Sequence, residues 1–204
     1  MAERVLLKRY EEKLTYLTPP HAPSLVVTLG AEGNPNIGAF EQTMLCSNFP
    51  PCITIAVSPK ADTLANVHRT KEFTLGFPSP RMVDQVMAAG EKLPPNESEF
   101  DLAELTPVES EIVNPPRIAE CQVNFECVLQ WSKQAGDHFL VVGRVVVIDV
   151  DAALLREDKV ERRCGLDAVY YATSGVFFTP GNRITGSAER LVSKYEAARG
   201  RPGS

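Results

Sequence analysis

The sequence has no apolar run near the roughly 20 residues that a membrane-spanning helix requires. Its first 15 residues are charged and lack the apolar core of a signal peptide. The five cysteines are odd in number and form no CxxC pair, which argues against a zinc site or a disulfide framework. We therefore expect a cytoplasmic protein without membrane contact or metal, whose cysteines are buried free thiols.

Positive charge is also scarce, because 26 acidic residues outweigh 21 basic ones and give a formal net charge of −5. This balance argues against a nucleic-acid partner, which requires a basic face, but it permits a local basic pocket for a phosphate. No GxGxxG follows an expected strand and no GxxxxGK[ST] occurs, so dinucleotide-binding Rossmann and P-loop folds lack their central evidence.

The residues that are present are typical of a soluble globular protein, with 44% hydrophobic and 23% charged side chains. We expect one domain over residues 1–204, with a core at about 20–180 and a C-terminal helix at about 188–199. Short β-prone runs separated by turn residues predict strands at 24–29, 35–40, 52–57, 72–77, 121–131, 138–150 and 175–179. Helices are expected at about 63–69, 81–89, 98–103 and 151–156.

Two segments carry more specific expectations. Residues 36–51 are interpreted as a polar, small-residue loop that closes at Pro50 and Pro51, its first part overlapping the second strand. Residues 121–131 alternate, with Asn124, Glu126 and Gln130 opposite an apolar face, which predicts a half-buried strand.

Many short strands and few helices favour a mainly β fold, an antiparallel barrel with peripheral helices, over a βαβ fold. The interior of a small closed barrel is filled by side chains. A ligand must therefore bind at the rim or at a subunit interface.

The start of the expected helix at 63–69 is one candidate site. Lys60 precedes it, and Asp62 or Thr63 can cap it. Free amides at a helix N-terminus, with a hydroxyl and a nearby lysine, can hold a phosphate. A plain structural cap accounts for the same residues.

His138 is the second candidate. It follows Gly136 and Asp137 at the mouth of an expected hairpin, and an imidazole can donate a hydrogen bond to a carbonyl or phosphate. The alternative is a turn in which His138 is only a rim residue. Trp131, Tyr170 and Tyr171 can border such a site or only pack against the strands.

Taken together and in order, a set of short motifs resembles the flavin reductase-like family, whose fold is an FMN-binding split barrel of Greek-key-like, antiparallel type. The similarity covers roughly residues 20–178. It includes 24–29, Gly33 with Pro35-Asn36, Pro50-Pro51 with 53–57, Thr63 with Asn66-Val67, Glu72-Phe73, Glu99-Phe100, 116–120, and Gly136-Asp137-His138 with Gly143 and Val145.

The resemblance implies a homodimer, flavoredoxin-like, that binds FMN at the subunit interface. The segment Phe40, Glu41, Gln42 and Thr43 would run beside the isoalloxazine ring. Ser47, Lys60, Asp62 and Thr63, with Asn66 nearby, would lie toward the ribityl chain and phosphate.

His138 would orient NADH or NADPH. The hydride would pass to FMN and on to free flavin, a partner oxygenase or a small acceptor.

Two departures from the family pattern bear on flavin contacts. Gly76 stands where the family often has asparagine, and the sequence Phe40-Glu41-Gln42 has less serine and threonine than usual. A carboxylate at Glu41 fits poorly beside a phosphate, so it is expected to face the ring or solvent. Two alternatives remain: a split barrel that holds FMN or haem for storage or sensing without catalysis, and a protein resembling pyridoxamine-phosphate oxidase, for which a more basic phosphate pocket is expected.

Overall fold

The computed structural model describes residues 14–91, 93 and 99–182, so the helix expected at 188–199 lies outside the described residues. Seven antiparallel strands form one sheet in the order β2-β1-β5-β8-β9-β4-β3. Their bounds are β1 Ser24–Leu29, β2 Pro35–Phe40, β3 Thr43–Asn48, β4 Pro51–Val57, β5 Glu72–Gly76, β8 Val123–Ala135 and β9 His138–Val150.

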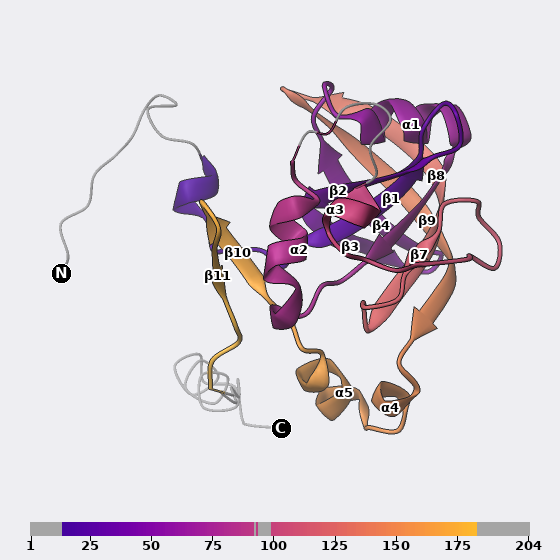
Figure 1. Ribbon diagram of the computed structural model, residues 1–204. Helices are drawn as coiled ribbons and strands as arrows, with labels where there is room; N and C mark the ends of the chain where they lie inside the picture. The colour runs from indigo at the N-terminus through magenta and orange to yellow at the C-terminus, as the bar shows by residue number, and fades with distance from the viewer. Residues whose placement is uncertain (1–13, 92, 94–98, 183–204) are drawn as a thin grey trace, which may run out of the picture.

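The connection between β2 and β3 requires the sheet to curl. These strands lie at opposite ends of the strand order, yet only Glu41 and Gln42 separate them. Three Cα–Cα steps span at most about 11 Å, whereas the edges of a flat seven-stranded sheet would be about 29 Å apart. The sheet therefore curls into a barrel (Figure 1) whose end strands β2 and β3 are not paired. Near this seam the hydroxyl oxygen of Ser24 in β1 lies 2.6 Å from that of Thr43 in β3. This is the predicted antiparallel barrel, split at one seam.

One hydrophobic core fills the barrel interior. It includes Val26, Ile55, Phe73 and Val141, none of which is exposed. Helix α1, Asp62–Thr70, closes one end of the barrel by adding Leu64 and Val67 to this core. Because successive side chains of a strand point to opposite faces, the alternate residues of β1 face outward.

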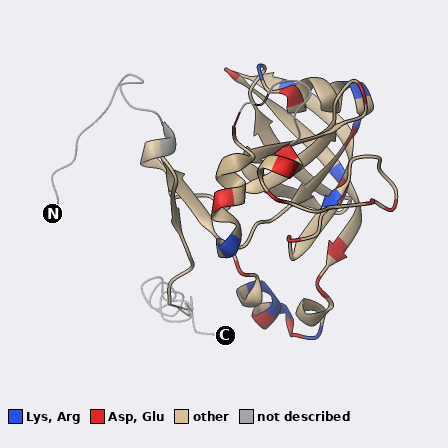
Figure 2. Cartoon of the chain, in the orientation of Figure 1, with Lys and Arg blue, Asp and Glu red and all other residues tan. Residues whose placement is uncertain are grey.

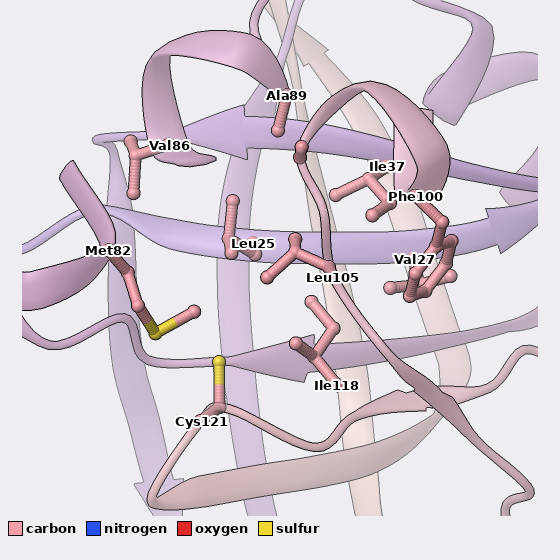
Figure 3. Close-up of a cluster of buried hydrophobic side chains, with 11 residues drawn as sticks. Leu25, Val27, Ile37, Met82, Val86, Ala89, Phe100, Leu105, Ile118 and Cys121 are labelled. Atoms are coloured by element: carbon pink, nitrogen blue, oxygen red, sulfur yellow. The ribbon is translucent and has the colours of Figure 1, made fainter. Parts of the chain in front are cut away.

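A second core lies outside the barrel, over β1 and β2. Leu25 and Val27 point into it from β1 (Figure 3). It is covered by η2 Pro80–Met82, α2 Val83–Ala88 and α3 Glu99–Leu102, in the two places where short helices were expected. Met82 and Val86 supply the apolar side of α2 and η2, as Figure 3 shows, whereas Met87 is exposed.

The segment 105–121, with its short strands β6 Pro107–Val108 and β7 Arg117–Ile118, extends this cover over β5 and β8. It buries Asn124 and Glu126, at 2% and 0% exposure, so the expected half-buried strand is wrong there. The polar face of β8 meets backbone amides of this segment, because Glu126 accepts hydrogen bonds from the amides of Glu111, Ile112 and Val113.

The remaining elements extend from the barrel (Figure 1). They are η1 Leu14–Leu17, α4 Ala152–Leu155, α5 Lys159–Gly165 and the hairpin of β10 Tyr170–Thr173 with β11 Val176–Phe178. Asp151 caps α4 through the amide of Ala153, at the predicted helical turn. Charges of both signs gather on α5 (Figure 2).

The cysteines only partly match their expectation. All five are free thiols, but Cys46 and Cys164 are exposed. Burial, with the charge of Glu120 as a smaller cause, raises the pKa of the Cys121 thiol to about 12.

Candidate functional site

Strand register brings three separate segments to one end of the barrel. The Ala56 amide donates to the Gln42 carbonyl at 3.0 Å, Ala56 pairs with Leu140, and Val57 pairs with Phe139. Neighbouring strands are about 4.8 Å apart, so Gln42 and Leu140 are separated by about 10 Å. The β2–β3 connection, the loop after β4 and the start of β9 at His138 therefore share this rim.

The end of β2 packs closely against the start of α1. A Cβ added at Gly38 would lie 2.6 Å from Phe40 Cε2 and 3.1 Å from Thr63 Oγ1, so only glycine fits between the two side chains. Thr63 is 3% exposed, and the Phe40 ring packs against the interior core. Phe40 and Thr63 thus form one wall of the rim.

The predicted cap of α1 is wrong. Ala61 occupies the N-cap position and no side chain caps the helix, while Asp62 and Thr63 lie within its first turn. The Leu64 amide donates to the Ala61 carbonyl at 3.1 Å, so the backbone amides of Asp62 and Thr63 are the ones left for an outside acceptor. Lys60 is exposed just before the helix, and its backbone amide donates to Ser58 Oγ at 3.3 Å.

Asn66 and Ser47 lie apart from this cluster. The Asn66 side chain is 8% exposed and donates to Thr28 Oγ1 at 3.1 Å, while its oxygen accepts from Arg69. Ser47 pairs with Cys52 at the start of β4, about 13 Å along the strand from Thr43. The structure thus brings together Phe40–Thr43, Lys60, Asp62 and Thr63, and places Asn66 and Ser47 away from them.

The expected loop at 36–51 contains a strand that the sequence reasoning missed. Residues 43–48 form β3, which pairs with β4 and has a register shift between Leu45 and Ser47. The alternation of this strand is obscured because Met44, Leu45 and Cys46 are all exposed at the sheet edge. Its order comes from pairing with β4, so the local sequence carries no clear signal for it.

His138 sits beside a tight turn. Gly136 adopts φ +65°, a conformation that favours glycine, and β8 and β9 pair up to Ala135 and His138. The His138 Nδ1 atom is 2.9 Å from Asp137 Oδ1, and the imidazole is 42% exposed. This hydrogen bond and the charge of His138 lower the pKa of the Asp137 carboxyl. Asp137 therefore holds one ring nitrogen and leaves Nε2 for a ligand.

An apolar outer face continues from the rim along β3, β4, β9 and β8. Register aligns Met44, Thr54, Val142 and Trp131 in one row across the four strands, with Leu140 two residues along β9. Met44 is 61% exposed and Trp131 49% exposed. Val142, which lies between them in the row, is only 4% exposed, so the exposed apolar side chains stand at the two ends of the row. Helices α2 and α3 pack over β1 and β2 instead.

The comparisons with known proteins agree with this geometry. The family model described as "Flavin reductase like domain" matches residues 19–177. The chain belongs to the flavin reductase-like family. It is similar to the crystal structure of nitrilotriacetate monooxygenase component B from Bacillus cereus, at 26% identity and a TM-score of 0.82, covering 91% of this chain and 100% of that chain.

Two further relatives of this family member are similar over most of their length. Flavoredoxin of Desulfovibrio vulgaris (Miyazaki F) is 25% identical with a TM-score of 0.76, covering 89% of this chain and 97% of that one. An uncharacterized protein of Aquifex aeolicus is 33% identical over 147 residues, which are 70% of this chain and 75% of that protein. The fold and family expected from the sequence are confirmed.

The structure also explains the departure from the family pattern at Gly76. A Cβ there would lie 2.7 Å from Cys121 Sγ and 2.9 Å from Asn124 Oδ1. The position is packed beneath the segment 105–121, so it has no room for a side chain in this family member. Among the described residues, no cluster of His, Cys, Asp or Glu could hold a metal ion, and no helix could span a membrane.

Proposed function

We propose that this protein is an FMN-dependent NAD(P)H oxidoreductase that works as a homodimer. The observation that carries the proposal is the convergence, at one rim, of the uncapped start of α1, the β2–β3 connection and His138. FMN, when bound, supplies the hydride-accepting ring, and the chain supplies binding, orientation and exclusion of water.

The start of α1 fits the phosphate of FMN. The Asp62 and Thr63 amides lie at a helix N-terminus, and exposed Lys60 adds a positive charge one residue before the N-cap. Asp62 in the first turn offsets that charge. Phosphate binding in this proposal therefore depends mainly on the amides and on Lys60.

The isoalloxazine ring of FMN fits beside the β2–β3 connection. Phe40 offers an apolar surface, and the backbone of Gln42 and Thr43 continues along β3. Gln42 holds the Glu41 carboxylate through its side-chain amide. Asn66 and Ser47 remain predicted flavin contacts, but they are weaker candidates than the rim residues. The Asn66 side chain already hydrogen-bonds to Thr28 and Arg69, and Ser47 lies farther along β3.

His138 is proposed to orient the nicotinamide nucleotide. Asp137 fixes its Nδ1, so Nε2 can hydrogen-bond to a carbonyl or phosphate oxygen of NADH or NADPH. The pair sits at a turn tip, where a nucleotide can approach from solvent. No general acid is required, because the cofactors carry out the hydride transfer.

The exposed apolar face supports the homodimer. Exposed apolar patches larger than a few hundred Å² mark interaction sites, and this face begins at the rim. A second copy packed on Met44, Trp131 and Leu140 would bury it and complete the wall of the flavin site. The Bacillus cereus relative is a monooxygenase component, so we propose a partner oxygenase, free flavin or a small molecule as the final acceptor.

An anaerobic absorption experiment tests the function. The protein is mixed with FMN, and the spectrum is recorded before and after NADPH or NADH is added. A shifted flavin band that bleaches with either nucleotide supports the reductase. A bound flavin that never bleaches supports a non-catalytic flavin-binding protein, and failure to bind flavin contradicts both.

The role of His138 has its own test. We expect His138→Ala to raise the KM for the nucleotide about tenfold, because one hydrogen bond to a charged or polar group is lost, while the Kd of FMN stays within about twofold. His68→Ala is the matched control, since His68 is also exposed and its ring packs edge-on against Phe139. Equal effects of the two substitutions would contradict the assignment.

A further inference from the structure

Two cavities meet at Glu41 on the outer side of the β2–β3 connection. One, of about 400 Å³, is lined by Tyr16, His21, Glu41 and Tyr171 among others. The other, of about 320 Å³, shares Glu41 and Tyr171 and continues to Met87. We call the two together the Glu41 groove.

Strand alternation separates this groove from the α1 side of the rim. Gly38 faces Phe40 and Thr63, whereas Ala39 packs against the outer core. The Phe40 ring packs against the interior core and also borders the groove, so it lies between the two sides. Because Glu41 follows Phe40, its side chain emerges on the same side as Ala39. The groove therefore lies across the connection from Lys60 and the start of α1.

The far wall of the groove is docked on the barrel. The Tyr171 amide donates to the His21 carbonyl at 2.9 Å, and the Tyr171 ring packs edge-on against Phe177 at 5.1 Å. Phe177 in turn packs against the outer core. At the hairpin tip, a Cβ on Gly175 would lie 3.9 Å from Met87 Cε. These contacts hold β10 in place opposite Glu41.

The lining has the chemistry of a cation site. Its charged side chains are Glu41 and Glu91, its described residues include no lysine or arginine, and its only histidine is His21. Aromatic and apolar groups from Tyr16, Tyr171, Phe40 and Met87 supply the rest. Carboxylates beside aromatic rings attract a cation and accommodate an apolar body, and they repel a phosphate.

We propose that the Glu41 groove binds a small cationic molecule with an aromatic or apolar body, and that Glu41 selects its charge. The connection thus separates two sites of opposite preference, with an anion at the α1 side and a cation in the groove. The groove can bind this molecule whether or not the proposed function is correct. The further idea that the flavin acts on the bound molecule rests on the proposed function.

The test compares three soluble probes that share a benzyl group: benzyltrimethylammonium, benzyl alcohol and phenylacetate. Their Kd values are measured on the full chain by ligand-observed NMR, with and without FMN. We expect the cation to bind about three- to fivefold more tightly than the alcohol, as a partly exposed ion pair allows. The anion should bind most weakly. Raising the salt concentration should reduce the cation preference.

Glu41→Gln should remove most of the cation preference, because only the exposed carboxylate of Glu91 then remains in the lining. Glu32→Gln is the matched control, because it removes the same charge from the exposed turn between β1 and β2. The proposal is overturned if the wild type binds cation and alcohol equally, if the cation does not bind, or if both substitutions reduce the preference alike. Flavin binding is read separately from the flavin absorbance, so loss of the proposed function leaves this result interpretable. The salt dependence tests the same point on the wild type should Glu41→Gln unfold.

Discussion

The buried carboxylate of Glu126 should be a major contributor to stability. Its side chain is 0% exposed, and its two oxygens accept hydrogen bonds from the backbone amides of Glu111 and Ile112 at 2.8 Å and of Val113 at 3.3 Å. Arg117 Nε lies 3.7 Å from one oxygen. The carboxylate therefore organises the segment that covers β5 and β8.

Replacing this carboxylate by an amide tests the inference. In Glu126→Gln, one oxygen becomes an NH2 group that faces at least one backbone N–H, so two donors meet and a buried amide loses its acceptor. An unsatisfied buried donor costs about 1–3 kcal/mol, and a charge-assisted bond is lost as well. We expect the free energy of unfolding to fall by about 2–4 kcal/mol, which would lower Tm by roughly 5–15 °C.

Urea denaturation followed by circular dichroism gives the change directly. Glu72→Gln is the matched control, because Glu72 on the neighbouring strand β5 binds the same segment through the backbone amide and side chain of Asn114, at 3.0 and 2.7 Å. That bond is solvent-exposed, and its substitution should cost less than about 1 kcal/mol. A Glu126→Gln value within 0.5 kcal/mol of the control (about the error of such comparisons) would refute the reasoning.

Three further predictions concern thiols, packing and assembly. Only Cys46 and Cys164 of the five cysteines should react with a chromogenic disulfide reagent in the native protein at neutral pH, and fast reaction of a third would show that the buried thiols are accessible. Gly143→Ala should lower the free energy of unfolding by about 1–3 kcal/mol, because a Cβ there would lie 2.4 Å from Phe73 Cζ, and calorimetry measures the loss. Trp131→Glu should shift sedimentation from dimer to monomer at micromolar concentration. An unchanged dimer would show that the subunits meet on another face.

The parts of the fold that the sequence predicts are those with strong local signals. The hairpin of β1 and β2 combines an apolar run with turn residues at 31–34, and both strands form as expected. The hairpin at Gly136 and Asp137 is likewise correct, although β8 continues to Ala135 and leaves a two-residue turn. Such features depend on neighbours in the chain, so a single sequence contains them.

The parts that it missed depend on contacts between distant residues. Glu126 looks solvent-facing in an alternating strand, and only the segment 105–121, folding back over it, supplies the three amides that bury it. Ala61 has no capping side chain, and the short β3 gains its order by pairing with β4.

The candidate site follows the same division. Phe40 to Thr43, Lys60 and His138 were placed by resemblance, and strand register brings them to one rim. The Glu41 groove had no sequence signal, because its walls come from η1, β2, α2 and β10. The roles of these residues and of the groove in binding remain predictions.

The link between β2 and β3 constrains the number of its residues more strongly than their identity. Glu41 and Gln42 belong to neither strand and are partly exposed, so either position can change its chemistry while the strands stay paired. Adding or deleting one residue is different, because it would turn every following side chain of β3 to the other face or shift its pairing with β4. Relatives are therefore expected to vary ligand preference here by substitution and to tolerate few insertions. A library that randomises these two positions at constant length is the most direct way to redesign the ligand preference of this chain.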